Sequence, residues 1–403
     1  MPLLAFLWIA FALNYLDRQM VYSMLPALKA DLGFEGARLG LIGTVFQWVY
    51  TITMPLAGRM ADVWRRDILI TSSLVLWSMA ALGCGFARSE VSFLGWRGVM
   101  AVTESLYYPA ALAVIASNYA PAVRSRALGI HQSAQLFGAV AGGWYGGWAA
   151  DNVGWREGFR IAAVVGIAYG GVLWWGVQRS KQYASAEAGR SSVLSSFRSL
   201  LRSRAYVALC FAFSAFCAMQ WIFFAWFPTF LQERFGLSMT ESGWNGTLFI
   251  QTSAIVGIVA GGIVTDKLRQ RWPAARLHVS AAGVLLSAPF AFLTFSADSL
   301  HEARVFSAGF GVFGGLLAAN AFAAAYDLMR DNSHGLAGGI LNMTGGISSG
   351  ATIYAAGAWK ESIGFSGLMS VVATVAVGTA LVLMVVSHRG QAKADLPPVR
   401  SGA

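Results

Sequence analysis

Long apolar stretches dominate the chain, and they limit its possible folds more than any other feature. A helix needs about 20 mostly apolar residues to cross the hydrocarbon core of a bilayer, and in lipid it satisfies its backbone hydrogen bonds internally. Stretches of this kind lie at 3–27, 38–58, 67–86, 92–117, 127–150, 159–178, 206–231, 242–264, 277–297, 301–326, 335–357 and 363–387. The sequence therefore predicts an all-α integral membrane protein with twelve transmembrane helices.

The composition supports a membrane protein and argues against one that binds nucleic acid. Only 12% of the residues are charged, about half the share that a soluble domain carries. The net charge is +10, but the basic residues stand in short gaps between apolar stretches and form no clustered patch for nucleic acid. The three cysteines lie in apolar stretches without metal-ligand spacing. We expect the lipid bilayer as a partner, no nucleic acid, and no cofactor.

The distribution of basic residues predicts the orientation in the membrane. With the N-terminus inside, 19 of the 29 Lys and Arg residues fall in cytoplasmic segments and 8 in outer segments. Cytoplasmic loops of membrane proteins carry such an excess of positive charge. We therefore expect a multi-pass protein of the cell (inner) membrane with both termini in the cytoplasm.

The two halves of the chain repeat each other. The tetrapeptide GTVF at 43–46 recurs as GTLF at 246–249, an offset of about 203 residues. Parallel repeats of six helices are a known plan of secondary transporters, in which the substrate site lies between the halves. The predicted organisation is an N-terminal six-helix bundle (1–178), a cytoplasmic linker (179–205), a C-terminal six-helix bundle (206–387) and a cytoplasmic tail (388–403).

Four ionisable residues lie inside predicted spans. Asp17 and Arg18 are adjacent in the first span, and Arg97 and Glu104 are seven residues apart in the fourth. Seven residues make two helical turns, so Arg97 and Glu104 share one face. Each charge costs roughly 2.5–3.5 kcal/mol at the centre of a membrane helix. In the second half, the positions that correspond to Asp17 and Arg18 carry the uncharged Met219 and Gln220. A salt-bridge network that only joins two helices is one interpretation, and a functional site is the other.

The chemistry of these residue types favours the functional interpretation. A buried arginine offers a carboxylate a permanent and forked positive partner. A buried acid beside an arginine can bind and release a proton, because burial and the neighbouring charge act on it in opposite directions. An anion site and a proton site in one cavity are what a proton-coupled symporter requires.

The motifs around these residues resemble a known family. NYLDR in the first span, GRMADVWRR after the second, and Arg97 with Glu104 in the fourth are similar to the anion:cation symporter family of the major facilitator superfamily. This family includes bacterial proton-coupled transporters of sugar acids of the galactonate type. The resemblance implies the major facilitator fold, with proton coupling at Asp17 and Glu104, substrate binding at Arg18, and Arg97 as the ion-pair partner of the acids.

The same resemblance implies further site residues. By matching position in the family's motifs, substrate contacts are expected at Tyr15, Tyr50, Gln135 and Asn342, and a gating loop at Gly58, Asp62 and Arg66. The function predicted is secondary active transport of a small organic anion by alternating access, with protons as the coupling ion and the protein acting as a monomer.

Two other functions remain open on sequence grounds. A spinster-like lysolipid transporter also carries an N-Y-x-D-R first helix and a fourth-helix Glu, and a receptor built on the same fold would transport nothing. An enzyme is not expected, because the spans hold no H-E-x-x-H, G-x-S-x-G or paired-cysteine signature.

Overall fold

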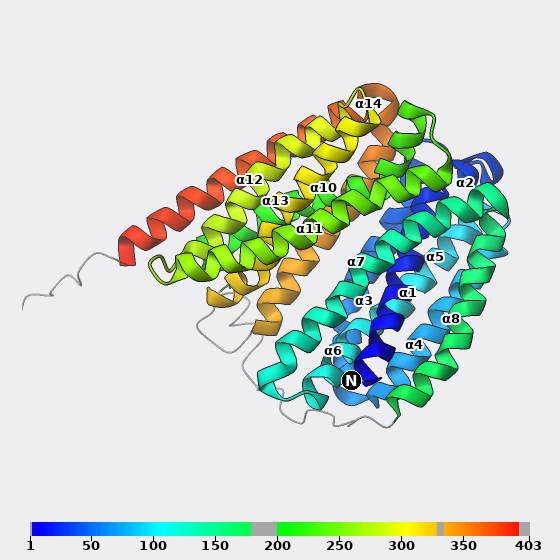
Figure 1. The fold of residues 1–403 in the computed structure, drawn as a ribbon, viewed down its shortest axis with the longest axis horizontal. Helices are drawn as coiled ribbons and strands as arrows, with labels where there is room; N and C mark the ends of the chain where they lie inside the picture. Colours follow the sequence, from blue (N-terminus) through cyan, green and yellow to red (C-terminus); the bar gives the residue numbers. More distant parts are fainter. Residues whose placement is uncertain (1, 179–199, 329–333, 395–403) are drawn as a thin grey trace, which may run out of the picture. The chain divides into compact units, whose positions relative to one another are not determined.

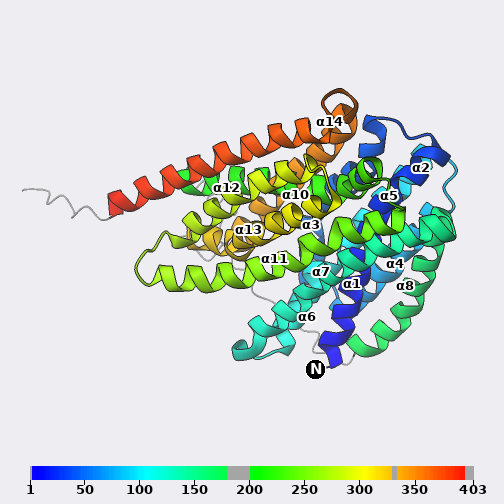
Figure 2. The same cartoon turned by 45° about the horizontal axis from the view of Figure 1, so that its top comes forward.

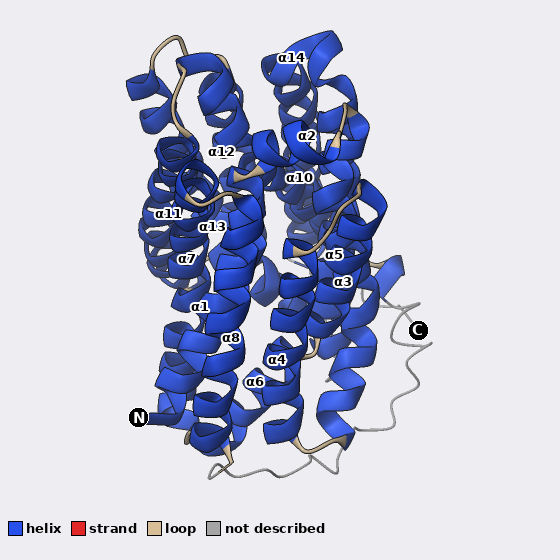
Figure 3. Cartoon of the chain, turned by 90° about the vertical axis from the view of Figure 1, so that its right-hand side faces the viewer, coloured by secondary structure: helices blue, strands red, loops and turns tan. Residues whose placement is uncertain are grey.

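The computed structural model describes residues 2–178, 200–328 and 334–394, and within these ranges it holds helices and loops but no strand (Figure 3). The helices are α1 (Pro2–Ser23), α2 (Leu25–Leu32), α3 (Ala37–Val63), α4 (Arg66–Gly85), α5 (Glu90–Ser105), α6 (Tyr107–Asn118), α7 (Pro121–Asn152), α8 (Trp155–Val177), α10 (Arg204–Phe235), α11 (Met239–Arg269), α12 (Ala275–Phe295), α13 (Leu300–Asp327) and α14 (His334–Ala394). The prediction of an all-α membrane protein is confirmed.

All twelve predicted spans are helical, but they are not all equally apolar. Within the described residues, nine helical segments are long and apolar enough to cross a membrane. α1 and α7 are not among them: α1 carries polar and charged side chains, and α7 is rich in glycine and polar residues. α14 counts once although it covers two predicted spans, which meet at the non-helical Gly364. The exact count of twelve spans stays a prediction.

Prolines interrupt two of the predicted spans. α1 ends at Ser23 and α2 begins at Leu25, with Pro26 in its first turn. α5 and α6 meet at Leu106, three residues before Pro109. Proline lacks the N–H that would bond to the carbonyl one turn earlier, and its ring crowds that carbonyl. The second interruption follows directly after Glu104, at the end of α5.

The sequence repeat is visible in the way the helices begin and end. Gly33 follows α2 with φ 76°, and Gly236 follows α10 with φ 67°; each closes its helix by a hydrogen bond to the carbonyl four residues earlier. Such left-handed positions favour glycine. Ser89 caps α5 and Ser299 caps α13, each accepting from the backbone N–H three residues on. The equivalent ends of the two halves therefore use the same local chemistry.

The described residues form two compact units. Unit 1 takes in the described parts of Met1–Gly189, Gln220–Gln251 and Ser349–Phe365, and unit 2 those of Arg190–Met219, Thr252–Ser348 and Ser366–Ala403. Most of the predicted linker, 179–199, and the end of the predicted tail, 395–403, lie outside the described residues. The predicted division into bundles, linker and tail stays a prediction.

Unit 1 is built around α1. α7 packs along α1, while α4 packs against both α5 and α8 (Figures 1 and 2). On α7, Gly138, Gly142 and Gly146 follow each other at four-residue spacing, and a Cβ on each would come within 2.5 Å of a carbonyl oxygen of α1. Small residues on one helix face let membrane helices approach this closely. The close contact fixes the rotation of α1, and with it the direction of its charged side chains.

Segments of the second half complete unit 1. A Cβ on Gly243 of α11 would lie 1.9 Å from the carbonyl oxygen of Gly143 on α7, so the two backbones touch. Ser23 donates a hydrogen bond of 2.8 Å to that same carbonyl. At the end of α7, the Asp151 carboxylate accepts hydrogen bonds from the backbone N–H groups of Met239 and Thr240, where α11 begins. We call this region the α7–α11 contact.

In unit 2, α12 packs against α13 (Figure 2). Arg276 at the start of α12 donates to both carboxylate oxygens of Asp327 at the end of α13, at 2.7 Å each. His278 stacks on Trp272, with ring centroids 4.1 Å apart. The Arg276–Asp327 contact joins the start of α12 to the end of α13.

Candidate functional site

The four ionisable residues predicted from the sequence are buried inside unit 1. Asp17 and Arg18 on α1 are 4% and 6% exposed, and Arg97 and Glu104 on α5 are 0% and 1% exposed. Charged groups are rarely buried this deeply unless they are paired. The contacts of each one therefore indicate what the site can do.

One ion pair joins the two helices. The Arg18 Nε lies 2.7 Å from Oε2 of Glu104, and both side chains are almost fully buried. Asn14, one turn before Arg18 on α1, donates to the same oxygen at 2.9 Å. The other oxygen of Glu104, Oε1, has no hydrogen-bond partner among the described residues. Glu104 is thus held through one oxygen by a cation and a neutral donor.

Aromatic rings surround the Arg18 guanidinium. Its central carbon lies 4.0 Å from the ring centroid of Tyr50, 5.0 Å from that of Tyr15 and 5.1 Å from that of Phe46. Rings at these distances attract a cation. The structure thus brings the two predicted substrate-contacting tyrosines together around the predicted anion anchor, while their role in binding stays a prediction.

Asp17 and Arg97 have different surroundings. Asp17 Oδ2 accepts a hydrogen bond of 3.0 Å from the indole N–H of Trp77 on α4. The Arg97 Nη1 lies 3.4 Å from the sulfur of Met100, whereas Nε and Nη2 have no hydrogen-bond partner among the described residues. The ion pair seen therefore joins Arg18 to Glu104, and the predicted role of Arg97 as partner of the acids stays a prediction.

The remaining predicted contacts are placed less closely. Gln135 is half-buried on α7, one turn before Gly138, which packs against Ala12 and Tyr15 of α1. Asn342 is exposed and belongs to α14 within unit 2. The structure therefore places Gln135 on a helix that packs against α1, which carries Arg18, and the role of Asn342 stays a prediction.

The predicted gating loop is partly helical. Gly58 and the exposed Asp62 lie in the last turns of α3, and Arg66 is the first residue of α4. Arg66 is buried and donates to the carbonyls of Ala61 on α3, at 3.3 Å, and Ala113 on α6, at 3.4 Å. Its guanidinium joins the ends of three helices, while a gating role stays a prediction.

Two contributors to the cluster, and one buried histidine on α7, were not predicted from the sequence. Asn14 could have been found, because it stands four residues before Arg18 and so shares its face. Trp77 gave no signal, since its contact with Asp17 depends on how α4 packs. His131 is fully buried, stacks on Phe11 with ring centroids 4.6 Å apart, and has Nε2 3.2 Å from the Tyr107 hydroxyl.

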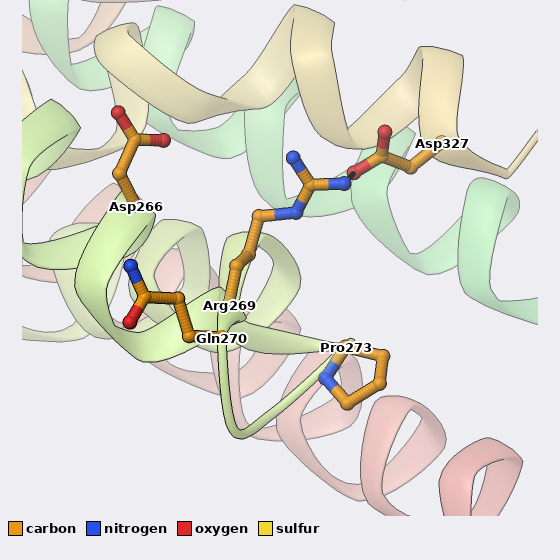
Figure 4. A pocket seen from close by; sticks show the side chains of 5 residues that line it. All are labelled: Asp266, Arg269, Gln270, Pro273 and Asp327. Carbon is orange, nitrogen blue, oxygen red and sulfur yellow. Dashed lines mark ion pairs between the residues drawn. The ribbon is translucent and has the colours of Figure 1, made fainter.

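A separate cavity of about 500 Å³ lies in unit 2 (Figure 4). It is lined by Asp266, Arg269, Gln270, Pro273 and Asp327, and the Arg269 guanidinium is directed at Asp327, with Nη2 3.5 Å from Oδ2. Because its carboxylates outnumber its one arginine, it is a poor site for an anion. We assign the candidate site to the cluster around Arg18.

Known proteins share the sequence pattern and the fold. The family model described as Major Facilitator Superfamily matches residues 7–353. The probable galactarate/D-glucarate transporter GudP of Escherichia coli (strain K12) is 25% identical over 94% of this chain and 92% of its own length. Protein spinster homolog 1 of Bos taurus is 28% identical over 70% of this chain and 57% of its own length.

Among solved structures, a bacterial homolog of the human lysosomal transporter Spinster, in an inward-facing and unoccupied conformation, covers 98% of this chain and of its own length with a TM-score of 0.78. At 18% identity this shows a shared fold. The match of the family model over most of the chain confirms the superfamily that the motifs predicted. The chain belongs to the Major Facilitator Superfamily, and it is a multi-pass membrane transporter, not an enzyme.

Proposed function

We propose that the protein is a proton-coupled symporter that carries a small sugar-acid anion across the cell membrane by alternating access, with both termini in the cytoplasm. The observation that carries this proposal is the buried ion pair between Arg18 and Glu104, with Asn14 on the same oxygen. Curated relatives are named as transporters of galactarate and D-glucarate, of hexuronate and of D-galactonate. The substrate class therefore has support from both chemistry and relationship.

The geometry suggests how anion and proton are linked. A substrate carboxylate needs a charge-assisted partner in this buried site, and Arg18 is the arginine with aromatic rings around it. When the anion takes Arg18, Glu104 keeps only the neutral Asn14 donor, and an unpaired buried charge is costly. A proton on Glu104 removes that charge. Linkage then requires that protonation strengthen anion binding by the same factor.

Replacing Glu104 by Gln tests the coupling. Glu104→Gln resembles the protonated acid, so the variant should bind substrate and exchange it between the two sides of a vesicle membrane. It should lose accumulation driven by a pH gradient, measured with labelled galactonate in proteoliposomes. Glu90→Gln is the matched control on the same helix, because Glu90 is in the first turn of α5, away from the cluster. Accumulation by Glu104→Gln at the wild-type level would falsify the assignment.

A lysolipid is the second candidate substrate. Spinster proteins are among the relatives, and the fold is shared with a bacterial spinster homolog. The same proteoliposomes should be tested with a lysolipid beside the sugar acids. Transport of the lysolipid without transport of any sugar acid would favour this candidate and contradict our proposal.

A further inference from the structure

Arg97 is the least satisfied charged side chain of the cluster. It is 0% exposed, and two of its three guanidinium nitrogens have no hydrogen-bond partner among the described residues. Its contacts are the sulfur of Met100, at 3.4 Å, and the ring of Phe46, 4.5 Å from the guanidinium carbon. Neither contact supplies a carboxylate, and the acids Asp17 and Glu104 attract Arg97 without an ion pair or hydrogen bond to it.

Structural stability does not explain this arrangement. Burying an arginine is costly unless a carboxylate or several acceptors compensate it. Arg18 shows the usual solution, since it pairs with Glu104 at 2.7 Å. Asp17, the other acid of the cluster, is held by Trp77. Two donor nitrogens of the Arg97 guanidinium, Nε and Nη2, therefore have no acceptor among the described residues.

Arg18 and Arg97 lie close to each other, because both contact the ring of Phe46. Their guanidinium carbons are 5.1 and 4.5 Å from the same ring centroid of Phe46, so they are at most 9.6 Å apart, the total of those two distances. Five carbon–carbon bonds of about 1.5 Å each span about 6 Å when extended. With one hydrogen bond of about 2.8 Å at each end, a six-carbon chain with two carboxylates can reach both arginines.

We propose that Arg97 is a second anion-binding side chain of the transport site, and that the substrate is a dicarboxylate whose two ends bind Arg18 and Arg97. This inference rests on the proposed function and narrows its substrate class from sugar acids in general to those with a carboxylate at each end. Both guanidinium groups lie within about 5 Å of the Phe46 ring, so one ligand of this length can reach them together. The substrate thereby supplies the acceptor that Arg97 lacks in the protein.

The test compares two ligands that differ at one end only. Galactarate has a carboxylate at both ends of its six-carbon chain, and galactonate has a neutral hydroxymethyl group in place of one of them. Binding of each to purified wild-type protein and to Arg97→Met is measured by calorimetry at fixed pH in a chloride-free buffer. Arg38→Met is the matched control, because it removes the same charge from a side chain that is 69% exposed.

We expect wild type and Arg38→Met to bind galactarate at least tenfold more tightly than galactonate, as a charged hydrogen-bonded pair predicts. In Arg97→Met the ratio of the two affinities should fall toward one. The thermal midpoint of Arg97→Met in detergent should equal or exceed that of wild type, because a buried guanidinium with two nitrogens unpartnered within the described part of the chain is removed.

Each other outcome contradicts a defined part of this reasoning. Equal affinities in wild type, or an unchanged ratio in Arg97→Met, overturn the second anion site and leave the proposed function standing. A fall in the thermal midpoint of Arg97→Met, with the ratio retained, makes Arg97 a structural residue. Binding of neither acid to wild type overturns the sugar-acid proposal together with this inference. Galactonate affinity that depends on added chloride in wild type but not in Arg97→Met assigns Arg97 to an inorganic anion.

Discussion

The hydrogen bonds of Asp151 predict how firmly the α7–α11 contact is closed. Asp151 near the end of α7 accepts from the backbone N–H of Thr240 at 2.7 Å, from its hydroxyl at 2.6 Å, and from the N–H of Met239 at 3.3 Å. These N–H groups begin α11, where a helix has no internal acceptors for them and attracts negative charge. Asp151 thus caps a helix of the second half from a helix of the first.

The size of the effect follows from the capping chemistry. Loss of an Asp cap to Ala costs about 0.5–2 kcal/mol, and we take about 1 kcal/mol because Asp151 is exposed and its charge is screened. In the alternating access that we propose, the α7–α11 contact opens. If the cap exists only while the contact is closed, its loss in Asp151→Ala destabilises the closed state by about 1 kcal/mol. The population of the open state then becomes roughly fivefold larger than in the parent protein. Asp151→Asn should show a smaller change, because Asn also caps helices well.

Cysteine labelling measures that population. Ser242, beside Gly243 in the α7–α11 contact, is 2% exposed, and its hydroxyl has no hydrogen-bond partner among the described residues, so Ser242→Cys loses no bond. In protein without its three native cysteines, the maleimide labelling rate of Ser242→Cys should rise about fivefold on adding Asp151→Ala. Asn152→Ala, at the exposed neighbouring position, is the control and should change nothing. A rate within twofold of the parent in the Asp151→Ala protein would refute the reasoning.

Three further predictions concern the cluster and its support. Arg18→Lys should weaken sugar-acid binding at least tenfold by calorimetry, because the lysine ammonium cannot donate the two parallel hydrogen bonds of a guanidinium. An unchanged affinity would mean that another residue binds the substrate carboxylate. Trp77→Phe leaves the buried Asp17 without its donor, which costs about 1–3 kcal/mol, so the thermal midpoint in detergent should fall. Gly146→Ala should lower that midpoint strongly, since its Cβ would lie 2.1 Å from a carbonyl of α1, whereas Gly171→Ala meets nothing within 4 Å and should be neutral or slightly stabilising.

The helices were predictable from the sequence because a membrane segment satisfies its backbone internally, so each apolar stretch carries its own signal. The repeat was predictable for a similar reason, since Gly33 and Gly236 mark equivalent ends by local conformation. The apolar signal of α1 and α7 is weaker than that of the other predicted spans, because packing against each other lets them carry polar residues and glycine. The α7–α11 contact had no local signal, as it joins segments about a hundred residues apart.

The ion pair between Arg18 and Glu104 could not be predicted from the sequence, for a geometric reason. Helical periodicity places Arg97 and Glu104 on one face of α5, but it does not give the rotation of α1. Asp17 and Arg18 are adjacent and therefore point about 100° apart, so one of them faces Glu104 and the other does not. The glycines of α7 fix that rotation by their contact with α1, and Arg18 is the one that faces Glu104.

This arrangement separates the two acids, and the separation can be tested. Glu104 is compensated by Arg18, the group that the substrate carboxylate would claim, whereas Asp17 is held by the neutral Trp77 donor, which an anion does not compete for. We therefore expect substrate binding to displace the partner of Glu104 and to leave that of Asp17 in place. Galactarate affinity should lose most of its dependence on pH in Glu104→Gln and keep most of it in Asp17→Asn, as measured by calorimetry between pH 5 and pH 8. The reverse pattern would make Asp17 the acid that responds to the substrate, and Glu104 the one that joins the two helices.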